Sequence, residues 1–256
     1  MIRGSRFLLL LGGVLVVLAF GIWLCWHSPD IVLRYHFWRI KAYAPLLLDA
    51  SRRHFEAVLQ QGENTRDWLR AQLDVSHPVD ASKAAILLAH MGDVDSAPQI
   101  RNLLAHGLVR TGSHWQGSPV HFGPNAEAVG ITWLRRNSAE ALGVLKDADA
   151  IQPLCMALRS PDYETRRAAE QSLLQIGDRS GTYNYISSLL SDGTWLYKPG
   201  QKEPFKRVCD LAVDVVEKLS GEAFGSYPSR NAEPDEALQL LNRRVEECRG
   251  WLSVNS

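Results

Sequence analysis

The chain has no excess of positive or negative charge and none of the sequence motifs that mark common enzyme classes. Its 256 residues carry 28 basic and 28 acidic side chains, so no overall field draws nucleic acid or an anionic surface to it. The sequence contains no G-x-S-x-G elbow, phosphate-binding loop, dinucleotide-binding glycine pattern or H-E-x-x-H pair. Each of these motifs positions the reacting groups in one large class of enzymes. We expect a non-catalytic protein that binds neither a cofactor nor nucleic acid.

Cysteines are also few, and their spacing does not indicate a disulfide framework. Cys25 lies in an apolar segment, and Cys155, Cys209 and Cys248 make an odd number without a C-x-x-C spacing. Cys155 and Cys209 fall within helical patterns, where a buried free thiol is ordinary. Alternating β-branched runs of strand length are absent as well, and this absence favours an all-helical chain.

One long hydrophobic run is present, at the N-terminus. Residues 7–26, FLLLLGGVLVVLAFGIWLCW, carry no charge and follow two arginines. Twenty helical residues span a hydrocarbon core of roughly 30 Å. A cleaved signal peptide is the alternative, because residues 19–21 offer a small-x-small site. The apolar run continues beyond that site to Trp26, and we therefore predict an uncleaved anchor over 1–28 that contacts lipid through 7–26.

The anchor implies a single-pass membrane protein. Arg3 and Arg6 on the short tail favour an N-terminus inside and an exported main part, whereas Arg34, Arg39 and Lys41 favour the opposite orientation. Of the two, we favour export. Between the anchor and the rest of the chain, residues 29–62 are expected to form a juxtamembrane helical segment that is broken at a proline.

The remaining chain, residues 63–256, repeats one helical stripe. A small residue is followed by apolar residues four and seven positions later, which places all three on one helix face. We expect the small member to let a neighbouring helix approach closely. The four stripes are Ala84, Leu88, Met91; Ser138, Leu142, Leu145; Ala169, Leu173, Ile176; and Ala212, Val216, Leu219.

A second helix is expected after each stripe. Its apolar positions keep a constant spacing from the stripe before it, and Asp95 and Asp149 stand where the N-caps of two of these helices would fall. Metal binding by these aspartates is the alternative to capping. The expected apolar pairs are Ile100 and Leu104, Leu154 and Leu158, and Tyr185 and Leu189.

The sequence RRNSAEALGVLKDADAIQPLCMALRSPDYETRRAAEQSLLQIGD, residues 135–178, resembles the HEAT repeat, in the short variety first associated with phycobilisome lyases. It has that pattern's paired Arg and Ala, its Leu-x-x-Ile-Gly-Asp ending and its proline in the second helix. Lys146 stands where the family usually has Gly. The resemblance extends over about 80–192 and implies an all-α solenoid of stacked helical pairs, but solenoids of this kind serve many functions.

Two insertions interrupt the repeats. The stripes are 54, 31 and 43 residues apart, so the first and third intervals exceed the shortest by 23 and 12. The extra residues fall in 106–130 and 191–205, and insertions of this kind commonly line a binding face. Each holds two aromatic side chains that we predict as interface anchors, although they could instead fold back onto the stack. These residues are Trp115, Phe122, Trp195 and Tyr197.

Two further patterns could belong to a site. Arg135 and Arg166 occupy equivalent places in successive repeats and are candidates for a basic ladder that grips an acidic partner. Ion pairs with neighbouring glutamates are the alternative. His106, His114 and His121 could supply a zinc site, but their spacings of eight and seven residues match no compact ligand motif.

The C-terminal segment, residues 233–252, is expected to be an amphipathic helix that closes the stack through Leu238, Leu241 and Val245. Taken together, the sequence predicts a membrane-anchored HEAT-repeat scaffold or adaptor that binds an unknown protein through the solenoid surface and its aromatic loop edge. The alternative is an enzyme or a cofactor- or metal-binding protein, similar to a chromophore lyase, that uses the histidine-bearing insertion.

Overall fold

The computed structural model describes residues 28–40, 49–109, 126–197, 206–229 and 233–255. The chain divides into two compact units, Met1–Asp67 and Trp68–Ser256, and each is described by itself. The division into an anchor, a juxtamembrane segment and a solenoid remains a prediction.

In the first unit, α2 packs against α3. α2 spans Pro29–Arg39 and α3 spans Asp49–Leu59. Leu33 and Phe37 on α2 and Phe55 on α3 are buried, because they recur at helical spacing on the facing sides. His36 and His54 join the two helices through a hydrogen bond of 2.8 Å between their Nδ1 atoms. A short helix, α4, follows at Asn64–Arg70.

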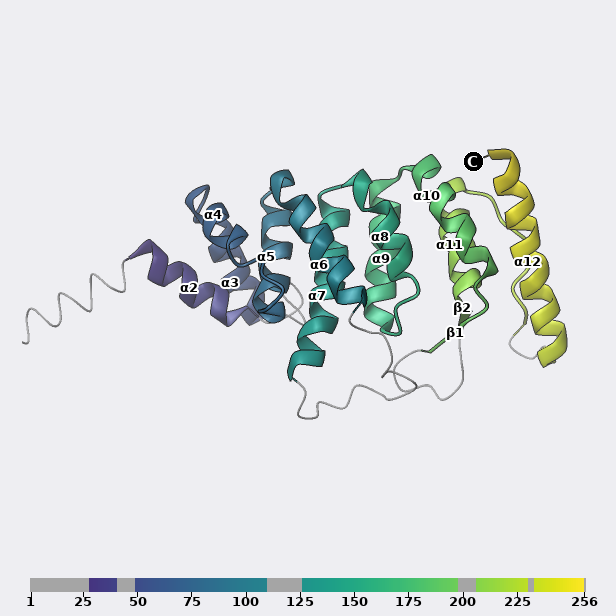
Figure 1. Ribbon diagram of the computed structural model, residues 1–256, viewed down its shortest axis with the longest axis horizontal. Coiled ribbons are helices and arrows are strands. Elements are labelled where there is room, and N and C mark those ends of the chain that lie inside the picture. Colours follow the sequence, from purple (N-terminus) through teal and green to yellow (C-terminus); the bar gives the residue numbers. More distant parts are fainter. Residues whose placement is uncertain (1–27, 41–48, 110–125, 198–205, 230–232, 256) are drawn as a thin grey trace, which may run out of the picture. The chain divides into compact units, whose positions relative to one another are not determined.

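The second unit is a two-row stack of helices, as Figure 1 shows. One row consists of α5, α7, α9 and α11, the other of α6, α8 and α10, and α12 packs on α11 at the C-terminal end. Short 3-10 helices, η1 to η3, adjoin the second-row helices. The bounds are α5 Pro78–His90, η1 Val94–Ser96, α6 Ala97–Val109, α7 Ala126–Val144, η2 Ala148–Ala150, α8 Ile151–Ala157, α9 Tyr163–Ile176, α10 Arg179–Ile186, η3 Ser187–Ser191, α11 Val208–Ser220 and α12 Pro234–Asn255.

The first two members of each predicted stripe face the inside of this stack, whereas the third members Met91, Leu145 and Ile176 are only partly buried. Ala84, Ser138, Ala169 and Ala212 are all completely buried. α7 and α9 approach closely at Gly143, where an added Cβ atom would stand 2.6 Å from the Cβ of Ser172. Small side chains therefore let adjacent first-row helices approach closely, as the sequence indicates.

One second-row prediction is wrong. Tyr185 was expected on the buried face of its helix, but it is 42% exposed, and Tyr183 and Ile186 are buried in its place. The reason is the position of the buried face, which runs through Tyr183, Ile186, Leu189 and Leu190 at spacings of three and four residues and leaves Tyr185 to one side. α10 ends at Ile186 and the chain continues as the 3-10 helix η3.

The capping prediction is also wrong. Asp93 and Asp147, not Asp95 and Asp149, occupy the N-cap positions of η1 and η2, and neither side chain makes a capping bond. All four aspartates instead pair with arginines of the preceding helical pair. Arg70 contacts Asp93 and Asp95, and Arg101 contacts Asp147 and Asp149.

The membrane part of the predicted fold is corrected. The expected anchor, residues 7–26, lies outside the described residues. None of the helices that the structure does describe is both long and apolar enough to cross a membrane, and the two longest, α7 and α12, carry charged side chains along their length. The structure therefore supports the helical solenoid, but not a transmembrane helix, a single-pass membrane localisation or the predicted lipid contact.

Candidate binding edge at the second insertion

A short β-hairpin forms the described base of the second insertion. β1, Trp195–Leu196, pairs antiparallel with β2, Lys206–Arg207, so that Trp195 is opposite Arg207 and Leu196 is opposite Lys206. With two residues a strand, the hairpin is too short to leave an alternating pattern in the sequence.

The side chains of β1 and of Tyr197, the residue that follows it, alternate between core and solvent. Leu196 is buried, whereas Trp195 and Tyr197 are 44% and 48% exposed. Residues two apart on an extended chain share one face, so the two aromatic side chains project together from the side opposite the core. Both predicted anchors of this insertion are thus placed on one exposed surface, which we call the β1 edge.

Arg166 holds the β1 edge against the solenoid. Its side chain is only 2% exposed, and its Nη1 donates to the carbonyl oxygens of Ser160 and Pro161, at 2.6 and 2.8 Å. Nη2 donates to the carbonyl oxygen of Tyr197 at 2.5 Å. Burial lowers the pKa of Arg166, and the nearby charge of Asp162 opposes that effect. An arginine remains a cation here, and it ties the turn before α9 to the insertion.

Arg135, the equivalent residue in the preceding repeat, is also inside the solenoid. It is 3% exposed, and its long side chain occupies the space that Gly107 leaves by lacking a Cβ, which would stand 2.6 Å from the Arg135 Cγ. Its Nε and Nη2 donate within its own helix, to the Ile131 carbonyl and the Thr132 hydroxyl. Arg135 and Arg166 therefore do not form the exposed basic ladder that the sequence suggested.

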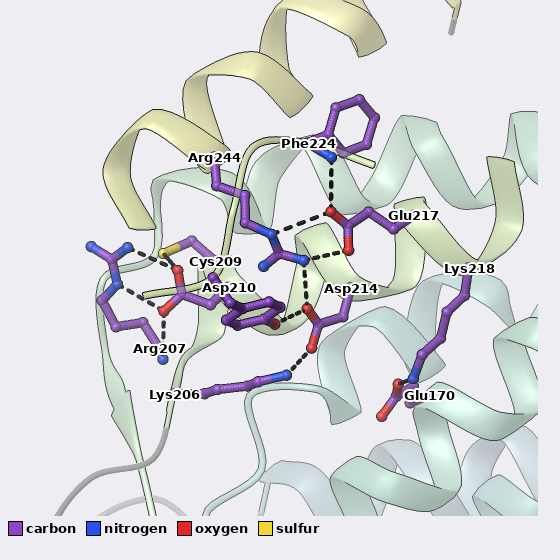
Figure 2. A network of polar contacts seen from close by, with 11 residues as sticks. Glu170, Lys206, Arg207, Cys209, Asp210, Asp214, Glu217, Lys218, Phe224 and Arg244 are labelled. Atoms are coloured by element: carbon purple, nitrogen blue, oxygen red, sulfur yellow. Dashed lines mark hydrogen bonds and ion pairs between the residues drawn. The ribbon is translucent and has the colours of Figure 1, made fainter. Parts of the chain in front are cut away.

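An ion network includes both residues of β2, as Figure 2 shows. Asp214 of α11 accepts hydrogen bonds from Lys206 of β2, from Arg244 of α12 and from the Tyr227 hydroxyl. Arg244, 1% exposed, also pairs with Glu217, and its guanidinium stacks 4.0 Å from the Tyr227 ring centre. One buried carboxylate thus joins the hairpin, α11 and α12.

Charge pairing, rather than an open acid or base, characterises this network. Burial alone would lower the pKa of Lys206, but the charge and hydrogen bond of Asp214 outweigh it and raise that pKa. Burial and the bond to Asp214 raise the pKa of Tyr227. Arg207 pairs with Asp210 at 2.8 Å and donates to Asn242 of α12 at 2.7 Å. Because each cation has a carboxylate partner, we interpret the network as a brace for the hairpin.

The described cysteines are not placed for covalent chemistry. Cys155, Cys209 and Cys248 are all buried free thiols. Burial raises the pKa of Cys155 and of Cys248 to about 12, and it also raises the pKa of Cys209. A thiol reacts as its thiolate, so these three side chains are poor nucleophiles in the folded chain.

The first insertion contributes little described structure. Trp115, Phe122, His114 and His121 lie outside the described residues. α6 extends to Val109 and α7 begins at Ala126, so both ends of the predicted insertion are helical. His106 is therefore a helix residue, and its Nδ1 is buried without a hydrogen-bond partner in the described part of the chain. Within the same residues, no group of three or more possible metal ligands occurs.

Sequence reasoning missed the residues that fix the edge. The bracing role of Asp214 and Arg244 needs a contact across 30 residues, and no local pattern marks it. The arginine–aspartate pairs of successive repeats were hidden by unequal separations, 23 residues for Arg70 and Asp93 but 46 for Arg101 and Asp147. No apolar stripe precedes Arg70, so the repeats provide no register in which the two arginines align.

Comparison with known proteins agrees with this architecture. Residues 132–195 match the family of HEAT repeats. The chain is also 40% identical over 82 residues to the phycocyanobilin lyase subunit alpha of a Picosynechococcus species, and this match covers 30% of each protein. The matched repeats include α7, α8, α9 and α10, which lead to the β1 edge. The chain therefore carries short HEAT-like repeats of the phycobilisome-lyase type.

Proposed function

We propose that this protein is a non-catalytic scaffold or adaptor that binds another protein through the β1 edge and the adjoining solenoid surface. The observation that carries the proposal is the pair of exposed aromatic side chains, Trp195 and Tyr197, on a strand whose other face is buried. Tryptophan and tyrosine are enriched among the residues that dominate interface energetics. HEAT-repeat stacks commonly provide such protein-binding surfaces.

The rigidity of the edge supports the same function. An interface residue that is already ordered loses less conformational entropy on binding. Arg166 fixes the Tyr197 carbonyl, Leu196 fixes the strand in the core, and the Asp214 network fixes the opposite strand. The two aromatic side chains are thus displayed from a braced backbone.

The experiment is affinity capture from a native extract, with the full chain as bait. A Trp195→Ala/Tyr197→Ala variant is expected to retain less than a tenth of the partner that the wild type retains, because anchors of this kind contribute about 2 kcal/mol or more. Tyr185→Ala is the matched control, since Tyr185 is also exposed but lies on α10. Equal retention by all three proteins would refute the proposal.

A second candidate is a role in handling a phycocyanobilin-type chromophore, which the 40% identity to a phycocyanobilin lyase subunit favours. The buried thiols Cys155, Cys209 and Cys248 would then not be attachment sites. Titration of phycocyanobilin with the full chain, followed by its visible absorbance, tests this role. A saturable spectral change at one equivalent would favour it, and an unchanged spectrum would exclude it.

A further inference from the structure

The pairing of the hairpin determines which backbone groups of β1 face outward. The carbonyl of Thr194 accepts from the N–H of Val208 at 3.0 Å, so these two residues form a hydrogen-bonded pair. Hydrogen-bonded and non-bonded pairs alternate along an antiparallel ladder. Trp195 opposite Arg207 is therefore a non-bonded pair, and both the N–H and the C=O of Trp195 point away from β2.

Within the described part of the chain, no strand pairs with this outward edge at Trp195. Neither the N–H nor the C=O of Trp195 has a hydrogen-bond partner among the described residues, and the same holds for the N–H of Tyr197. The next acceptor along the edge, the Tyr197 carbonyl, is taken by Nη2 of Arg166. This guanidinium N–H donates to an acceptor that a neighbouring strand would otherwise satisfy.

We propose that the outward backbone edge of β1 binds an extended peptide segment of the partner as a third strand, paired with the backbone of Trp195. The inference rests on the proposed function and specifies how the partner binds. One residue of the incoming segment would accept from the Trp195 N–H and donate to its C=O, as in other cases of strand addition to a sheet edge. The side chains of Trp195 and Tyr197 would then contact alternate residues of that segment.

Two arrangements make the edge suitable for this pairing. The outward N–H and C=O both belong to Trp195. One opposite residue in extended conformation can therefore bond to both of them. Its position is also fixed on both sides, by Arg166 at the end of β1 and by Lys206 and Arg207 on the partner strand. A strand fixed in this way can accept a peptide without first becoming ordered.

Trp195→Pro separates backbone pairing from side-chain contact. Proline removes the outward N–H, while the bonds between β1 and β2 do not use that group, and edge strands tolerate proline at such positions. Trp195→Ala removes the same indole ring but keeps the N–H. The probe is a twelve-residue peptide selected from a random display library on the full wild-type chain. We expect Trp195→Pro to bind it about tenfold more weakly than Trp195→Ala does.

A second measurement uses the wild-type chain and needs no protein variant. The selected peptide is synthesised with a single N-methyl group at each backbone position in turn. The peptide that is methylated at the amide donating to the Trp195 carbonyl is expected to bind about tenfold more weakly. Its two neighbours should tolerate the change, because their N–H groups point to the other side of an extended chain.

The outcomes separate this inference from the proposed function. Equal affinities of Trp195→Pro and Trp195→Ala, both folded by circular dichroism, together with tolerance of N-methylation at every position, would overturn strand pairing but leave an aromatic binding edge. Failure of the library to yield any binder would also overturn it. A wild-type dimer that Trp195→Pro dissociates would show that a second copy occupies the edge. If the Trp195→Ala/Tyr197→Ala variant captured as much partner as the wild type, the proposed function would be overturned instead.

Discussion

At the scale of single residues, Lys146 departs from the residue type that its repeat would favour. Lys146 has φ 53°, in the left-handed region, whereas the equivalent end of α5 has Gly92 at φ 68°. In both cases the next residue donates back into the helix, from Asp93 to Leu88 and from Asp147 to Leu142. The departure of Lys146 from the family pattern is therefore a strained helix end, and not a different connection.

Lys146→Gly is expected to raise the free energy of unfolding by about 1 kcal/mol. The substitution relieves the steric cost of a side chain in the left-handed conformation, less the additional backbone entropy that glycine brings to the unfolded chain. Urea unfolding followed by circular dichroism measures the change, and Lys146→Ala, which retains a Cβ, is the control. A Lys146→Gly chain no more stable than Lys146→Ala would contradict the assignment of strain.

Cys155 should make the stability of the chain sensitive to alkaline pH. Burial raises its pKa to about 12 from 9.0, so above pH 9 the unfolded thiol releases a proton that the folded thiol retains. The unfolded state then binds fewer protons, and the free energy of unfolding falls as pH rises from about 9 to 12. Between pH 8 and 10, in reducing buffer, the free energy of unfolding of Cys155→Ala is expected to fall by about 1 kcal/mol less than that of the wild type. Parallel losses would contradict the burial of this thiol.

At the scale of helices, much of the architecture could be predicted because it depends on local periodicity. The stripes around Ala84, Ser138, Ala169 and Ala212 identified all four first-row helices, and these residues are buried as expected. The prediction for Tyr185 failed because the buried face of this segment runs through Ile186, Leu189 and Leu190, one residue further along the chain. The contact of Asp214 with Arg244 could not be predicted, since it depends on how α12 folds back on α11.

The crossing of α7 and α9 is expected to tolerate no added methyl group. In Gly143→Ala, the new Cβ would stand 2.4 Å from the Ser172 hydroxyl oxygen and 2.6 Å from the Ser172 Cβ. The two helices must separate to accommodate it, and we expect a loss of about 2 kcal/mol in the free energy of unfolding. Denaturant unfolding at constant slope measures the loss.

Ser172→Gly provides the matched test of that explanation. It removes two of the three atoms that the new methyl group would meet and leaves only the side-chain oxygen of Gln175, at the cost of the hydrogen bond from Ser172 to the Ala139 carbonyl. The Gly143→Ala/Ser172→Gly chain should therefore be more stable than the sum of the two single changes predicts. Strict additivity would mean that the crossing is not the source of the loss.

At the scale of the whole molecule, the second unit combines a repetitive stack with one irregular edge. The stack is fixed by small residues between helices and by arginine–aspartate pairs between successive repeats. The irregularity is the hairpin after η3, where a buried guanidinium and a buried carboxylate, those of Arg166 and Asp214, secure a strand that exposes two aromatic side chains. Sequence reasoning predicted Trp195 and Tyr197 as anchors from the length of the insertion, and both are exposed, but it placed Arg166, which is buried, in a binding surface.

The measurement that tests this account most directly is hydrogen–deuterium exchange of the full chain, with and without its captured partner. Binding at the β1 edge predicts slower exchange of the amides of Trp195 and Tyr197, whose N–H groups have no hydrogen-bond partner among the described residues. Amides of α6 and α8, in the other row of the stack, should be unchanged. Protection confined to those helices, with free exchange at Trp195 and Tyr197, would contradict the account.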